Sequence, residues 1–365
     1  MDLTIAKSEL LPMVARCQGA ISPKSPMPAF ANVWISVNGG TIDVSATDGY
    51  LGASSGADLT ESSKPDTIGV HGRDLLERVK ALPDGGIRVQ TKKSSVLLSA
   101  MKGSRSFTLP CMSELDKPSI DDAPDVGGVI IPAATLSTLI DRTHYAISTD
   151  TQRAHVNSAM IEIVDGVIRV VTTNGHMLAT ATAKLDTSPA DMAPILVPLA
   201  AVSELRKLLA NVAPTDSIRL VASTDKRTAF FSTGGVVFST RLVDAQFPPW
   251  RQVIPSEHAS LVTVTRAALA DAVRAVAVAS EKGKAAVSLD FKSGTIEIRA
   301  GGDAFDSVPC ELDGKPLSVG VNYGYVLSVL DALDSDEVGF KLGSELDPIV
   351  VNAPDFVAVV MPMRV

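Results

Sequence analysis

Thr47-Asp48-Gly49 and Thr173-Asn174-Gly175 close two β-like runs of this 365-residue chain, and the two turns lie 126 residues apart. The runs are 41–45 and 167–172, and each follows a helix-like segment and a short apolar strand. A third copy with a decayed turn begins near Val262. Repetition at this period predicts three copies of one unit and a symmetric scaffold, which need not contain an active site.

The composition indicates sizeable cores and a reducing compartment. Apolar residues make up 45% of the chain and aromatic residues only 4%, so Val, Ile, Leu and Ala must fill the core. The cysteines Cys17, Cys111 and Cys310 are odd in number and far apart, which gives neither a metal spacing nor a disulfide framework. The start lacks a signal-like pattern, and no apolar run approaches the roughly 20 residues that span a bilayer. We therefore expect a soluble cytoplasmic protein, and its net charge of −8 argues against holding nucleic acid by its global field.

Each unit divides into two halves with the same order of elements, namely strand, helix and three strands. In the first unit, Ser8 is expected to cap a helix that runs to Gln18, and 72–82 forms the second helix. A tight hairpin is expected at Gly39-Gly40, between strands 31–37 and 41–46, and again at Asp165-Gly166 in the second unit. The later helices are expected at 133–147, from Pro198 onward, after a Thr265 cap and after Asn322.

The places where the pattern restarts predict the domain boundaries. One lies in the Asp- and Pro-rich stretch 116–128 and the other near 255–260. We expect an α+β protein with three domains, 1–125, 126–255 and 256–365. Because each helix must cover a sheet face, the simplest arrangement places all helices on the inner side of a continuous curved sheet. Edge strands of neighbouring units would then pair, and a closed assembly would leave no exposed edge.

Basic residues occupy the helix faces opposite the apolar stripes in five of the six expected helices. Glu9, Glu77 and Asp141 share these faces, so an ordinary solvated face is the alternative. If the helices line a common concave surface, the basic residues would contact a polyanion through phosphates, without base readout. The residues are Arg16, Arg73, Lys80, Arg142, Lys207 and Arg274, with Lys282 and Lys284 just beyond the fifth helix, whereas the sixth helix presents Ser328 and Asp331.

Three segments carry a resemblance to a known family. Residues 173–179 (TNGHMLA) are similar to T-D-G-H-R-L-A, 242–251 (LVDAQFPPWR) to L-V-D-G-x-F-P-x-Y-x, and 359–365 (VVMPMRV) to V-V-M-P-M-R-L. In this order and spacing, over essentially the whole chain, they resemble the β sliding clamp family of bacterial replicative DNA polymerases. The resemblance implies a ring-forming homodimer of three-domain clamp protomers around duplex DNA, placed there by an ATP-driven loader. It implies a nucleoid-associated processivity factor of DNA replication with no catalysis, cofactor or metal.

The resemblance also implies a hydrophobic peptide groove between the second and third domains. Its partners would be the DNA polymerase III alpha subunit, the clamp loader delta subunit, and other polymerases and repair proteins. Methionine suits a site that accepts several partners, and Pro362 suits an edge position. The carried-over groove residues are Val156, Thr173, Gly175, His176, Met177, Leu178, Pro248, Val253, Leu346, Pro348, Val360, Met361, Pro362 and Met363.

Several positions depart from the family pattern. Asn174 replaces the usual Asp, Met177 the usual Arg, and Gln252 a common Arg, which predicts a groove that is more apolar and pairs acidic peptide residues less well. Ala154 and His155 stand where the family often carries aromatic residues near DNA.

Other family positions are retained. Lys24 matches a DNA-contacting position, and Arg153 a basic position near the groove. The matching dimer-interface residues are Ala277 and Val278 in one segment and Arg105 and Phe107, within 104–109, in the other.

Two other interpretations stay open. An enzyme could combine His144, His155 and His176 with Asp141 or Asp150, but these spacings match no ligand or catalytic motif, and lone histidines are usually structural. A specialised clamp paralogue, for inhibitor resistance or a mobile element, would explain the altered groove residues.

Overall fold

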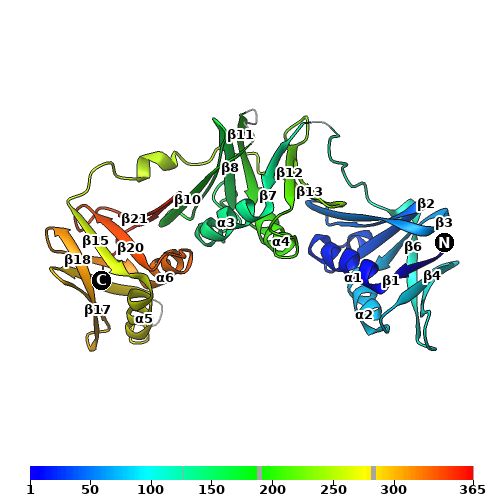
Figure 1. Cartoon of the computed structure of the whole chain (residues 1–365), viewed down its shortest axis with the longest axis horizontal. Helices are drawn as coiled ribbons and strands as arrows, with labels where there is room; N and C mark the ends of the chain where they lie inside the picture. Colours follow the sequence, from blue (N-terminus) through cyan, green and yellow to red (C-terminus); the bar gives the residue numbers. More distant parts are fainter. Residues whose placement is uncertain (126, 187–190, 281–284, 365) are drawn as a thin grey trace. The chain divides into compact units, whose positions relative to one another are not determined.

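The computed structural model describes residues 1–125, 127–186, 191–280 and 285–364, and these form two compact units (Figure 1). Unit 1 comprises Met1–Ala134 and Lys207–Leu242, and unit 2 comprises Thr135–Arg206 and Val243–Val365. Each unit is built on one continuous antiparallel sheet. The α+β class expected from the sequence is therefore observed in both.

The sheet of unit 1 has ten strands and carries two helices. The elements are β1 (Asp2–Ala6), α1 (Lys7–Arg16), β2 (Asn32–Thr47), β3 (Leu51–His71), α2 (Gly72–Ala81), β4 (Gly86–Lys92), β5 (Ser95–Ala100), β6 (Ser106–Ser113), β7 (Val129–Pro132), β12 (Ser217–Ala222), β13 (Thr228–Thr233) and β14 (Val236–Arg241). The strand order is β1-β4-β5-β6-β3-β14-β13-β12-β7, with β2 on β3. Helices α1 and α2 lie side by side against β2 and β3 (Figure 1).

The sheet of unit 2 has twelve strands, in the order β11-β8-β9-β10-β22-β21-β20-β15-β18-β17-β16-β19. These strands are β8 (Ser158–Val164), β9 (Val167–Thr173), β10 (Met177–Lys184), β11 (Met192–Pro198), β15 (Ser260–Thr265), β16 (Ala286–Lys292), β17 (Thr295–Ala300), β18 (Ala304–Gly314), β19 (Leu317–Asn322), β20 (Glu337–Leu342), β21 (Ile349–Ala353) and β22 (Phe356–Val360). The later helices are α3 (Ala133–Thr143), α4 (Leu199–Leu209), α5 (Arg266–Ala277) and α6 (Tyr323–Asp331), and α5 packs beside α6.

Two strand pairs join neighbouring repeats. β3 of the first repeat pairs with β14 of the second in unit 1, and β10 of the second pairs with β22 of the third in unit 2. The compact units therefore divide the second repeat between them and do not follow the repeat boundaries. The domain boundaries at 125 and 255 stay a prediction.

The helices begin in a repeated way that confirms the half-unit pattern. The first N–H of α1, α3 and α5 donates to the backbone carbonyl of Gly85, Asp216 and Asp336, each the residue before a strand. The first N–H of α4 and α6 donates likewise to Asn157 and Ala285. A distant carbonyl thus satisfies a donor that the helix itself leaves open.

Some local predictions were wrong for this reason. Ser8 lies inside α1, because β1 runs to Ala6 and Gly85 accepts the bond from Lys7. The side chain of Thr265 makes no cap bond, whereas Oδ1 of Asn322 accepts from Gly324 and Tyr325 as expected. Pro198 ends β11 and does not begin α4.

The predicted hairpins differ in outcome. Asp165 and Gly166 have φ of 53° and 72° and connect β8 to β9, as expected. The strands expected on either side of Gly39-Gly40 form the single β2, whose pairing with β3 shifts register at Gly39 (φ 63°). Each half of β2 pairs a different part of β3 and not the other half, so the predicted hairpin was wrong and the glycines mark an irregularity within one strand.

The predicted apolar helix faces form the cores. Leu10, Leu75, Leu136, Leu205 and Leu269 have no exposed surface, one from each of the first five helices. Leu11, Leu76 and Leu327, also expected inside, are half-buried, and Met13 and Val329 are buried instead. The 3.6-residue periodicity therefore predicted the faces to within one position.

Candidate peptide groove and basic helix faces

The turn Thr173-Asn174-Gly175, the second turn, is fixed by its own side chains. Oγ1 of Thr173 donates to the carbonyl of Met177 (2.7 Å) and accepts from the N–H of Gly175 (3.1 Å). Oδ1 of Asn174 accepts from the N–H groups of His176 (2.8 Å) and Met177 (2.9 Å). Gly175 adopts φ 93°, a conformation that L-residues rarely take.

The turn Thr47-Asp48-Gly49, the first turn, makes the same four bonds. Thr47 donates to the Leu51 carbonyl (2.7 Å) and accepts from Gly49 (3.0 Å), and Oδ1 of Asp48 accepts from Tyr50 (2.8 Å) and Leu51 (2.7 Å). Gly49 has φ 91°. Because the turn needs only an acceptor oxygen at this position, the change to Asn174 leaves it intact.

Within the described ranges, the second turn and not the first is hydrogen-bonded to the carboxy-terminal tail, Met361–Arg364. The N–H of Met361 donates to the carbonyl of His176 (2.9 Å), and the N–H of Met363 donates to the carbonyl of Gly320 (2.8 Å). The His176 ring is stacked on Tyr325 of α6, with centroids 6.4 Å apart and planes 15° from parallel. The tail and the second turn are therefore joined directly, and the assignment of His176 and Met361 to a peptide groove stays a prediction.

Gly175 also accommodates Arg153. A Cβ atom at Gly175 would lie 3.5 Å from Nη2 of Arg153, so the guanidinium lies directly over the turn. The exposed ring of His176 and this guanidinium give the turn a polar surface.

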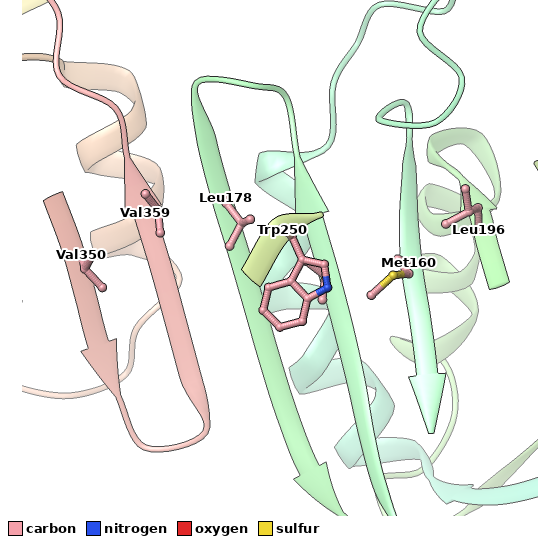
Figure 2. Close-up of a cluster of buried hydrophobic side chains, with 7 residues drawn as sticks. Met160, Leu178, Leu196, Trp250, Val350 and Val359 are labelled. Atoms are coloured by element: carbon pink, nitrogen blue, oxygen red, sulfur yellow. The ribbon is translucent and has the colours of Figure 1, made fainter. Parts of the chain in front are cut away.

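One face of the unit 2 sheet carries a buried apolar cluster beside this turn. The cluster, which we call the Trp250 cluster, is centred on a tryptophan in the 3-10 segment η5 (Trp250–Val253) (Figure 2). Figure 2 shows the Trp250 side chain between Leu178 and Met160, with Val359 and Val350 beyond Leu178. Its buried members are Met160, Val171, Leu178, Leu196, Trp250, Val350 and Val359, with Val243, Phe247, Val253, Ile254 and Val357 packed against them.

Strand alternation separates the predicted groove residues into two faces. Leu178 pairs with Thr173 and with Val359, so these three share the face of the Trp250 cluster. Met177 pairs with Val360, and both point to the opposite face, where they are 6% and 2% exposed. Of the two strand neighbours, only Leu178 faces η5.

The other predicted groove residues lie in four places. Pro248 and Val253 belong to the segment around η5, and Val253 packs on the cluster. Val156 is buried before β8. Leu346, 81% exposed, and Pro348 lie in the loop before β21, and no hydrogen bond within the described ranges joins them to the second turn. Pro362 is half-buried and Met363 is 36% exposed in the tail.

A charged network that the sequence analysis missed holds η5 on the sheet. Oε1 of buried Glu162 accepts from Nη1 of Arg169 (2.6 Å) and Nη2 of Arg251 (2.8 Å). The two guanidinium carbons lie 5.7 and 4.3 Å from the Trp250 ring centroid, within cation–π range. An acid in the otherwise apolar β8 sequence was the signal that could have identified this site.

The basic helix faces carry less free positive charge than the sequence suggested. Lys80 lies 3.2 Å from Glu77, Arg142 3.6 Å from Asp334, and Arg274 2.5 Å from Asp331 of α6. The sixth helix, which breaks the basic pattern, thus neutralises the fifth. Arg16, Lys24, Arg73 and Lys207 have exposed side chains, and Nη1 of Arg16 donates to Ser55 (3.2 Å). Lys282 and Lys284 lie outside the described residues.

The predicted dimer-interface residues lie at the ends of helices and strands. Val278 follows α5 and is 87% exposed, and Ala277 beside it is half-buried. Arg105, just before β6, donates to the Ala81 carbonyl at the end of α2 (2.5 Å). Phe107 lies under the guanidinium of Arg78, 5.6 Å from its carbon.

Two of the histidines considered for catalysis, His144 and His176, have separate structural roles. Nδ1 of His144 contacts the carbonyls of Ile140 and Asp141, burial lowers its pKa, and His176 stacks on Tyr325. In the described part of the chain, no three His, Cys, Asp or Glu residues are grouped to hold a metal. No helix among the described residues is long and apolar enough to span a membrane.

Comparison with known proteins covers the whole chain. Family models for the DNA polymerase III beta subunit match in order: the N-terminal domain at 1–121, the central domain at 130–249 and the C-terminal domain at 251–364. Proteins named "Beta sliding clamp" from Pseudomonas aeruginosa and Caulobacter vibrioides are 28% and 26% identical, over 100% of both chains.

Solved structures give the same result. The crystal structure of the DNA polymerase III subunit beta from Pseudomonas aeruginosa has a TM-score of 0.92 at 27% identity, over 100% of both chains. A sliding clamp from Bartonella birtlesii, crystallised with griselimycin, has a TM-score of 0.92 at 28% identity, again over 100% of both chains.

Proposed function

Because this chain belongs to the family of the DNA polymerase III beta subunit, we propose that it is a DNA sliding clamp that holds partner proteins through a groove at its second turn. The family is that of a processivity subunit rather than an enzyme. Two three-domain protomers would close a ring around duplex DNA, in the cytoplasm and on the nucleoid. The closed ring itself would then retain the DNA. Binding would therefore not need an overall positive charge, which is consistent with the net charge of −8.

The observation that carries the groove is the joint between β10 and β22. Here the second turn is bonded to the tail through His176 and Met361, beside the apolar Trp250 cluster. Apolar side chains next to backbone groups and adaptable methionines suit the binding of short linear peptides. The partners we propose are the polymerase alpha subunit, the clamp loader delta subunit, and other polymerases and repair proteins that carry clamp-binding peptides.

Ring closure would use the segments around Val278 and Phe107. Val278 is 87% exposed and is therefore accessible to a second protomer. The exposed bases Arg16, Lys24, Arg73 and Lys207 supply the proposed phosphate contacts.

Retention on DNA tests the ring directly. The protein is incubated with a clamp loader, ATP and either nicked circular or linear duplex, and the bound fraction is measured after gel filtration in about 0.3 M salt, which weakens phosphate contacts. We expect a dimer that stays on circles and leaves linear DNA through the ends. A monomer, or equal loss from both DNA forms, would contradict the ring.

Titration with a Gln-Leu-x-Leu-Phe type peptide tests the groove and the departure at position 177. We expect wild type to bind, and Met177→Arg to change the affinity for peptides with an acidic residue. Met177 is only 6% exposed, so Met177→Leu is the control for repacking. If the wild-type protein binds the peptide with the affinity usual for the family, and Met177→Arg does not change that affinity, the hypothesis of an altered groove is wrong.

A specialised clamp paralogue is the second candidate. Asn174 gives it no support because the turn is unchanged, which leaves Met177 and Gln252 as its basis. A second clamp gene in the same genome, together with failure of this protein to support replication in its place, would favour the paralogue.

A further inference from the structure

A pocket of about 530 Å³ lies on the outer side of Trp250, against β8 and β11 of unit 2. Its apolar wall includes Met160 and Leu196 from the sheet, Phe247 and Pro248 from the segment before η5, and Trp250 itself. This volume falls in the range of ligand sites and leaves room for a large side chain with its flanking backbone. None of the residues named here except Pro248 was carried over as part of the groove.

The charged side chains that line the pocket are Glu162 and Arg251. One carboxylate oxygen of Glu162 accepts from Arg251 and also from Arg169, which is outside the lining, so two guanidinium groups share one carboxylate. The side chain of Arg251 is 61% exposed and has donors beyond the one that Glu162 accepts. An anionic group on a ligand would therefore find a free charge-assisted partner at the rim.

The pocket lies next to the proposed groove. Pro248 belongs to both, and the Trp250 side chain separates the pocket from Leu178 on the groove side (Figure 2). A peptide that lies over η5 could therefore reach both places. A free small molecule would gain nothing from the neighbouring groove, whereas a peptide could occupy both places, so the geometry favours a segment of the partner protein.

We propose that this pocket is a second peptide subsite, which takes a bulky aliphatic side chain next to an acidic residue, both from the partner segment that also occupies the groove. The inference rests on the proposed peptide groove. The aliphatic side chain would lie between Leu196 and Trp250, and the acidic residue would bind Arg251.

The test compares a core peptide, Gln-Leu-Ser-Leu-Phe, with versions that carry Leu-Glu beyond a Gly-Ser-Gly spacer at either end. We expect one extended peptide to bind about tenfold more tightly, as for burial of one aliphatic side chain. It should also shift the fluorescence of Trp250, because the other tryptophan, Trp34, has no exposed surface. The same peptide with Gly-Gly in place of Leu-Glu should show no gain.

The pocket variant is Ala245→Trp, with Ala245→Ser as the matched control, because Ala245 is an exposed lining residue whose replacement should not affect folding. We expect Ala245→Trp to bind the core peptide normally and to lose the tenfold gain, and Ala245→Ser to keep it. A gain that survives Ala245→Trp, or no gain for either extension while the core peptide binds, would overturn the subsite and leave the groove standing. Failure of the core peptide itself would reject the proposed groove, and the subsite with it.

Discussion

The first and second turns have the same backbone and the same four hydrogen bonds, yet only the second is part of a candidate binding site. After the first turn comes Tyr50, 72% exposed, and the chain continues into β3 beside β14. After the second comes His176, which is bonded to the tail and stacked on Tyr325. The turn is thus a structural element that the first and second copies share. The neighbouring strand, the tail and η5 make one copy different.

The largest expected effect comes from removing the side chain of Trp250, which lies beside the second turn and not beside the first. Trp250 is 8% exposed at the centre of its cluster, so Trp250→Ala should destabilise the protein by about 3–5 kcal/mol and abolish peptide binding. Denaturant unfolding and peptide titration measure the two effects.

Trp34 in unit 1 supplies the matched control. It is fully buried, so Trp34→Ala should cost a similar amount, about 3–5 kcal/mol, but leave peptide binding intact wherever the protein remains folded. If both variants lose peptide binding equally, the second turn has no special role.

The network beneath η5 is expected to matter next. Glu162→Gln leaves two guanidinium groups without their shared carboxylate, which should cost about 2 kcal/mol and weaken peptide binding, because η5 is held less firmly. Asp141→Asn removes an exposed carboxylate bonded to Arg206 (2.7 Å) and should cost less than about 1 kcal/mol. Thermal melting and peptide titration of both variants would show whether the buried carboxylate of Glu162 contributes more than the exposed one of Asp141. Equal losses of stability and of peptide affinity in the two variants would contradict this.

Replacing the glycine of either turn by alanine should cost the same stability, so that only the effect on peptide binding should differ. Alanine at Gly49 or Gly175 would be held near φ 90° and should cost about 1 kcal/mol in either case. A Cβ atom would lie 3.4 Å from Phe30 in the first turn and 3.5 Å from Arg153 in the second, so the available space is also alike. Peptide affinity should fall only in Gly175→Ala, and a fall in both variants would mean that the effect comes from stability.

The smallest effect is expected from exchanging the acceptors. Asn174→Asp and Asp48→Asn each keep the oxygen that the turn uses, so the free energy of unfolding should change by less than about 0.5 kcal/mol. A larger loss, seen by chemical denaturation, would show that the spare amide of Asn174 has a partner of its own.

What could be predicted from the sequence depended on local physics. Apolar periodicity located the buried helix faces, and the repeated sequence of Thr47-Asp48-Gly49 and Thr173-Asn174-Gly175 located both turns, because these features depend on residues close in the chain. Helix starts were missed where the acceptor is a distant carbonyl such as that of Gly85 or Asn157, which no local pattern records. The motif residues around the second turn were found through the family resemblance. Glu162 and the two arginines it joins were not found, since their meeting depends on how η5 packs on β8.

Hydrogen exchange of the protein with and without the core clamp-binding peptide tests the central claim most directly, because it compares the two turns in one sample. The account predicts slower exchange at 173–178, at η5 and at the tail when the peptide is bound, and unchanged exchange at 47–51. Equal protection of both turns, or peptide binding with no protection at the second turn, would contradict it.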